Sequence, residues 1–189
     1  MSTTPHQGIV GLDRFAVTQR ATDTTERYDV CTVGPDGGPD HVIVTAQPRG
    51  RLRDKVVFFA DGTRSQPSFW FSPAPATGGR EAFDVFDAGG RPIGRFHKEL
   101  TGRNATWHVE ADGVRARAEE RSPGRFARLG VGARRSSLDF LDRDERCVLT
   151  TEPCRDTQDS RLVAVPDGRV DARVAAAWAV AFSAMRAAR

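Results

Sequence analysis

The sequence predicts an all-β protein with one helix: a closed antiparallel barrel of about twelve strands enclosing a hydrophobic C-terminal helix. Most of the chain consists of short alternating or apolar segments closed by Gly, Pro, Asp or Asn clusters, a pattern typical of antiparallel strands. No helical pattern lies between these segments, although parallel strands would need crossover helices. Residues 170–189 contain neither Gly nor Pro and are rich in Ala, which indicates a helix.

The strands follow one another along a single domain, which is the expected organisation for 189 residues. We expect a flexible N-terminus over residues 1–11 and one barrel domain over residues 12–189. Turns such as Asp87-Ala88-Gly89-Gly90 separate the strands. The segment 122–135 is irregular. The expected strands cover about 13–20, 26–33, 41–47, 55–60, 66–71, 81–86, 91–97, 105–110, 114–119, 136–141, 145–151 and 160–165.

Alternation is clearest in the segment 114–119, which reads VRARAE. Successive strand residues point to opposite faces, so the Val and the two Ala should face the core while the two Arg and the Glu face water. One face of the sheet is therefore expected to be exposed to solvent.

The C-terminal helix is expected over about 170–188, with Asp171 near its start and Arg186 and Arg189 at its negative end. From Val174 to Met185 every residue except Ser183 is apolar, so the helix has no polar stripe and should be buried all round. Those residues span about 18 Å at ~1.5 Å each, which is similar to the height of a small barrel. We therefore expect the helix inside the barrel; the alternative is a helix packed on one end of a sandwich.

Composition excludes several classes of protein. The net charge is +3, and basic residues are not clustered enough to predict nucleic-acid binding. No apolar run approaches the ~20 residues that span a bilayer, and residues 1–10 lack a secretory pattern, so we expect a cytoplasmic protein. Cys31, Cys147 and Cys154 have no metal-binding spacing and are expected to be reduced and mostly buried.

Catalytic motifs such as HExxH, GxSxG and the phosphate-binding GxxxxGK[ST] are absent from the sequence. We therefore expect no enzyme activity, no catalytic or metal-binding residues and no cofactor. His97 and His108 could face each other across neighbouring strands, but the sequence defines no third ligand beside them, so they are interpreted as surface or core residues.

The middle of the chain resembles the superfamily of tubby C-terminal-like domains, especially its LURP-one-related and phospholipid scramblase branches. The hairpin FDVFDAGGRPIGRF, residues 83–96, is similar to that superfamily's aromatic-Asp-Val-x-Asp-x-x-Gly-x-x-Ile-Gly pattern. It is followed in the same order by TWHV at 106–109, Asp112-Gly113, EER at 119–121 and Arg134-Arg135. The resemblance covers the chain from about Leu12 onward and implies a twelve-strand barrel threaded by the C-terminal helix.

Activities do not carry over with this resemblance. The phosphoinositide-contacting basic residues of tubby do not align here residue by residue. The calcium loop and membrane-spanning extension of the scramblases have no counterpart in this sequence.

One basic cluster is a candidate binding site. In an extended chain, residues at every second position share a face, so four cations would form an anion-binding stripe. A solvated strand edge is the alternative interpretation. The residues of this stripe are Arg49, Arg51, Arg53 and Lys55.

The leading hypothesis is a non-enzymatic binding or scaffolding barrel that contacts anionic phospholipid headgroups at the inner membrane face or a protein partner. The alternative is a scramblase-like protein acting on phospholipids, as the resemblance implies. A small-molecule carrier or enzyme is a third hypothesis, disfavoured because an apolar helix would fill the barrel. The ligand, partner, oligomeric state and pathway are left open.

Overall fold

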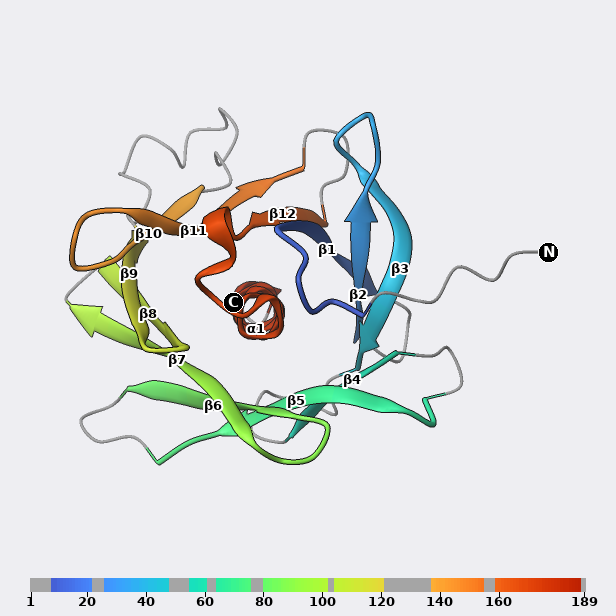
Figure 1. Cartoon of the computed structure of the whole chain (residues 1–189), viewed down its shortest axis with the longest axis horizontal. Coiled ribbons are helices and arrows are strands. Elements are labelled where there is room, and N and C mark those ends of the chain that lie inside the picture. Colours follow the sequence, from blue (N-terminus) through green and yellow to red (C-terminus); the bar gives the residue numbers. More distant parts are fainter. Residues whose placement is uncertain are drawn as a thin grey trace.

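A closed antiparallel barrel surrounds the C-terminal helix in the computed structural model, which describes residues 8–21, 26–47, 55–60, 64–75, 80–101, 104–120, 137–154 and 159–187. Each strand pairs with its neighbours in sequence, and the last strand returns to pair with the first. Figure 1 looks along the barrel and shows the helix end-on at its centre. The predicted fold class is confirmed, and a helix on the end of a sandwich is excluded.

The observed strands agree with the predicted ones to within a few residues. Their bounds are β1 Arg14–Ala21, β2 Glu26–Val33, β3 Pro39–Ala46, β4 Val56–Phe59, β5 Pro67–Pro73, β6 Glu81–Asp87, β7 Pro92–Thr101, β8 Asn104–Ala111, β9 Val114–Glu120, β10 Leu138–Leu141, β11 Cys147–Pro153 and β12 Ser160–Ala164. A short 3-10 turn, η2 (Pro166–Gly168), leads into the helix α1 (Ala172–Ala187). The irregular segment 122–135 lies outside the described residues.

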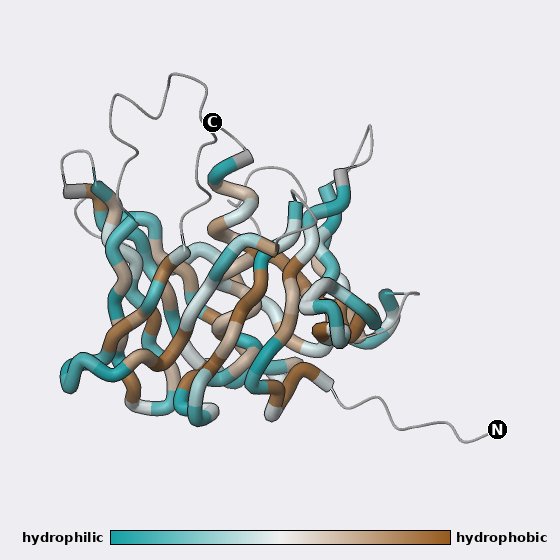
Figure 2. The backbone as a smooth tube through the Cα atoms, turned by 90° about the horizontal axis from the view of Figure 1, so that it is seen from above, coloured by the Kyte–Doolittle hydropathy of each residue, from teal (hydrophilic) through white to brown (hydrophobic). Residues whose placement is uncertain are grey.

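The barrel has two ends, which the turns between strands and the direction of α1 distinguish. Because the strands alternate in direction, the turns after β2, β6, β8 and β10 lie at the same end as the start of α1, which we call the turn end. The helix finishes at the opposite end, where its last turn rises above the strands in Figure 2. Gly90 in the β6–β7 turn has a φ of +83°, a conformation that favours glycine.

The side chains of every second strand residue point inward and form the core. In β9, Ala116 and Ala118 are buried while Arg115, Arg117 and Glu119 are exposed, as predicted. The same alternation runs along β8, where Trp107 and Val109 point inward. Near the N-terminus Ile9 is fully buried in the core, whereas residues 1–7 of the expected flexible segment lie outside the described residues.

The helix α1 is buried on every side, as its lack of a polar stripe predicts. Every residue from Val174 to Ala181 has no exposed surface. The run of Ala keeps the helix thin. The strand β7 also approaches the helix closely at Gly94, where an added Cβ would lie 2.6 Å from Val174 Cγ2. Asp171 caps the helix, because its carboxylate accepts a 2.8 Å hydrogen bond from the Arg173 backbone N–H.

Two cationic side chains on the strands are buried. The Arg161 guanidinium lies 4.7 Å from the Phe182 ring centroid and donates a hydrogen bond to Thr151, and both polar residues are buried. Lys98 is buried with its ammonium 5.2 Å from the Trp107 ring. These buried cations were not predicted, although alternation along β7 places Lys98 on the same face as the buried Phe96.

The three cysteines are free, and Cys31 and Cys154 are buried. Burial raises the pKa of the Cys31 thiol to about 11, so it stays protonated near neutral pH. The prediction of reduced, mostly buried cysteines is confirmed for these two, while Cys147 is half-buried.

Candidate functional site

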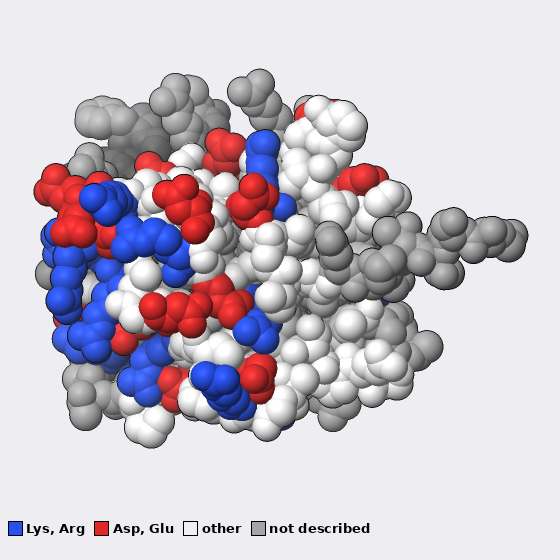
Figure 3. Space-filling view, in the orientation of Figure 1, with Lys and Arg blue, Asp and Glu red and all other residues white. Residues whose placement is uncertain are grey.

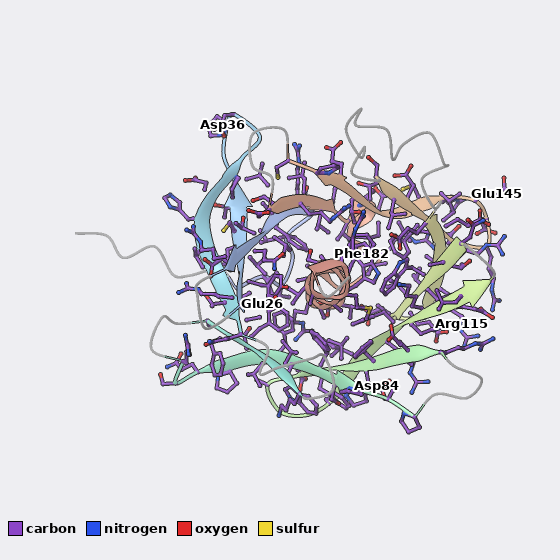
Figure 4. The ribbon with its side chains drawn as sticks, turned by 180° about the vertical axis from the view of Figure 1, so that it is seen from behind. Glu26, Asp36, Asp84, Arg115, Glu145 and Phe182 are labelled. Carbon is purple, nitrogen blue, oxygen red and sulfur yellow. The ribbon has the colours of Figure 1, made fainter. Side chains whose placement is uncertain are left out.

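The outer face of the barrel carries the side chains that are available to a partner, because α1 fills the axis. In Figure 4 Phe182 of α1 lies toward the centre of the barrel, while Asp84 and Arg115 lie at its periphery. The candidate residues discussed below all belong to outward-facing positions of the strands or to the residues that flank them.

The predicted basic stripe is described only in part. Arg49, Arg51 and Arg53 lie outside the described residues, in the connection that runs from β3 to β4. Lys55 is exposed and directly precedes β4, at the end of the barrel opposite the turn end. Its ammonium lies 3.7 Å from the centroid of the Trp70 ring, so Lys55 makes a cation–π contact.

Trp70 belongs to an aromatic pair on the outer face. It is half-buried on β5 and stands opposite Phe86 of β6, and their rings stack with centroids 4.0 Å apart and planes 16° apart. On the other side Trp70 stands opposite Val57 of β4. We call the residues Lys55, Val57, Trp70 and Phe86 the β4–β6 surface. It combines apolar side chains with a cation.

An acidic residue adjoins this surface but is compensated. Asp84 lies two residues before Phe86 on the same face of β6. Arg95 of β7 donates hydrogen bonds of 2.6 and 3.2 Å to its two carboxylate oxygens. This pairing raises the pKa of the Arg95 guanidinium above its usual range. The negative charge of Asp84 therefore weakens the positive potential near the β4–β6 surface only slightly.

The turn end has a different character. Figure 3 looks at the turn end. It shows Lys and Arg interspersed with Asp and Glu over the left half of this face, and a largely uncharged surface over the right half. Charges of both signs so close together cancel beyond a few ångströms in salt solution. This face therefore does not present the single-sign field that attracts an anionic surface.

The structure also brings His97 and His108 together, as their placement on neighbouring strands suggested. They stand opposite each other in the β7–β8 register, with ring centroids 4.3 Å apart and planes 10° apart. Burial lowers the pKa of both imidazoles, and the neighbouring His108 lowers that of His97 further. Both rings are therefore mainly neutral at neutral pH.

Two residues of these clusters, Glu99 and Trp70, were not predicted, although strand alternation could have placed both on the outer face. Glu99 lies two residues after His97, so both side chains share the outer face of β7. Trp70 lies between two inward-facing Phe residues in the segment FWF, which places its ring outside. In each case the alternation of strand residues indicates the outward position. The pairing of strands then decides which residue of the neighbouring strand lies beside it.

No family model matches the chain, and no match was found among the curated proteins. In the described part of the chain, none of the helices has the length and apolar character needed to cross a bilayer.

Proposed function

We propose that this barrel is a non-enzymatic binding module that attaches peripherally to anionic phospholipid through the β4–β6 surface and the basic residues that precede it. The observation that carries the proposal is the stacked Trp70–Phe86 pair with Lys55 held over the Trp70 ring on the outer face.

The physical basis is a combination of two forces. Aromatic side chains with an apolar body and an adjacent polar group favour the boundary between headgroups and acyl chains. Each Lys or Arg close to an anionic surface adds roughly 1 kcal/mol of attraction. Arg49, Arg51 and Arg53 lie two to six residues before Lys55 in the sequence, so the proposal includes them in the same basic stripe.

We expect the protein to co-sediment with vesicles of phosphatidylcholine and phosphatidylserine but not with vesicles of phosphatidylcholine alone. Binding should weaken as salt rises, because the Debye length falls from ~10 Å at 0.1 M to ~3 Å at 1 M. Changing the four basic residues of the stripe together to Gln should abolish binding and leave the melting temperature nearly unchanged, since the charge of the exposed Lys55 contributes little to folding. Trp70→Ala should weaken binding even at low salt.

A matched control removes the same number of cations at the turn end. The control variant carries Gln in place of Arg14, Arg91, Arg115 and Arg143, which are all exposed. It has the same net charge as the stripe variant, so it should retain most of the vesicle binding. Failure of the wild type to bind anionic vesicles at low salt, or equal loss in the two quadruple variants, would contradict the proposal.

A further inference from the structure

A cluster of three potential metal ligands lies on the outer face of β7 and β8. His97 and Glu99 come from β7 and His108 from β8, directly opposite His97. Glu99 reaches across the strands so that its Oε2 lies 3.6 Å from His108 Nε2. One ligand atom from each residue lies within 4.8 Å of the other two.

The cluster has an unsatisfied atom at its centre. His108 Nε2 is buried and has no hydrogen-bond partner among the described residues, since its distance to Glu99 is too long for a hydrogen bond. A buried polar nitrogen without a partner is destabilising. A metal ion bound to this nitrogen would satisfy it, and the neighbouring His97 and Glu99 supply further donors of the types that such an ion takes.

The donor set selects the kind of ion. Two imidazole nitrogens and one carboxylate oxygen suit Zn²⁺ and similar divalent transition metals, whereas Ca²⁺ and Mg²⁺ prefer oxygen ligands throughout. We propose that His97, Glu99 and His108 form a surface site for a divalent transition-metal ion such as Zn²⁺, with the fourth position of the tetrahedron open to solvent.

Coordination requires a small adjustment of the rings. In a parallel stack the two nitrogen lone pairs point along parallel planes, and a shared ion needs them to converge at Zn–N distances of about 2.0–2.1 Å. Rotation of one imidazole about χ2 achieves this, because both side chains face outward and are only half-buried.

Arg80 modifies the site without blocking it. Its guanidinium donates a 2.9 Å hydrogen bond to Glu99 Oε1, which leaves Oε2, the oxygen nearer His108, as the metal ligand. The contact orients the carboxylate as outer-shell partners of metal ligands do. The positive charge of Arg80, which is about half exposed, lowers the affinity, and the carboxylate of Glu110 on β8 partly offsets it.

Calorimetric titration of the full chain with ZnCl₂, after treatment with a chelator, would test the site. We expect saturable binding at one site per chain and a melting temperature that rises with Zn²⁺ concentration, because the ion binds the folded state. His97→Gln, Glu99→Gln and His108→Gln should each weaken binding at least ~10-fold, since even outer-shell changes have effects of that size. His41→Gln is the matched control: His41 is highly exposed, lies away from the cluster and should not matter.

Co²⁺ gives an independent measurement on the unaltered protein. Bound in a four-coordinate site with nitrogen and oxygen ligands, it should show visible absorption bands that disappear when Zn²⁺ displaces it. The proposal is overturned if the wild type binds no Zn²⁺ and shows no such bands, or if His97→Gln and His108→Gln, checked as folded by circular dichroism, bind as tightly as the wild type.

Discussion

Trp178→Ala is expected to lower the free energy of unfolding by ~3–5 kcal/mol, as for other large buried aromatic residues cut to Ala. Trp178 has no exposed surface and lies at the centre of an aromatic cluster on α1 and the strands around it. Its ring centroid lies 4.9 Å from Phe140, 5.1 Å from Phe182 and 5.8 Å from Trp107. Removing the indole leaves a cavity that strands of a closed barrel cannot collapse to fill.

One feature of Trp178 offsets part of this loss. Its indole N–H has no hydrogen-bond partner among the described residues, and an unpaired buried donor is destabilising by about 1–3 kcal/mol. Guanidinium unfolding followed by circular dichroism measures the net effect. Trp70→Ala, on the outer face, is the control and should have a clearly smaller effect. A loss below ~1 kcal/mol for Trp178→Ala would contradict the burial of α1 inside the barrel.

Gly94→Ala is expected to destabilise the fold by about 3 kcal/mol, at the upper end of the usual ~1–3 kcal/mol for overpacking. A Cβ at this position would lie 2.6 Å from the Glu110 backbone oxygen and 2.6 Å from Val174 Cγ2. The first contact is with the backbone of the paired strand β8, and the second is with the helix. Neither the backbone of β8 nor the helix α1 can move without disturbing other contacts of the barrel.

Two further variants separate the sources of this strain. Gly89→Ala in the exposed β6–β7 turn should change stability by less than ~0.5 kcal/mol, because the nearest atom to its Cβ is the flexible end of Asp87 at 3.4 Å. Val174→Ala removes the contact with the helix but is itself destabilising, because Val174 is fully buried. The double variant Gly94→Ala with Val174→Ala should therefore be less destabilised than the sum of the two single variants. Equal stability of Gly94→Ala and the wild type would show that α1 does not pass this close to β7.

The strands were predictable because their signal is local. Alternation and turn residues identify β9 and the β6–β7 hairpin without any knowledge of the rest of the chain. The helix was predictable because an apolar surface on all sides has one physical consequence, which is burial. Even the inference that α1 lies inside a barrel needed only its length and composition.

Contacts between distant residues were less predictable. The pairing of β1 with β12 joins residues such as Phe15 and Val163, and no local pattern records it. The register that places His108 of β8 directly opposite His97, and so close to Glu99, depends on which strand lies beside β7. The contact of the Lys55 ammonium with Trp70 was not predictable either, because it joins a residue before β4 to a residue of β5.

The most direct test of the proposed attachment to membranes uses the fluorescence of Trp70. Trp107 and Trp178 are buried inside the barrel, with 1% and 0% of their surface exposed, so an acyl-chain quencher outside the protein reaches Trp70 in preference to them. We expect vesicles containing phosphatidylserine and brominated acyl chains to quench the protein's emission at low salt, and Trp70→Phe to bind the same vesicles with little quenching. Emission that brominated anionic vesicles leave unchanged, or quenching that persists in Trp70→Phe, would contradict contact between the β4–β6 surface and lipid.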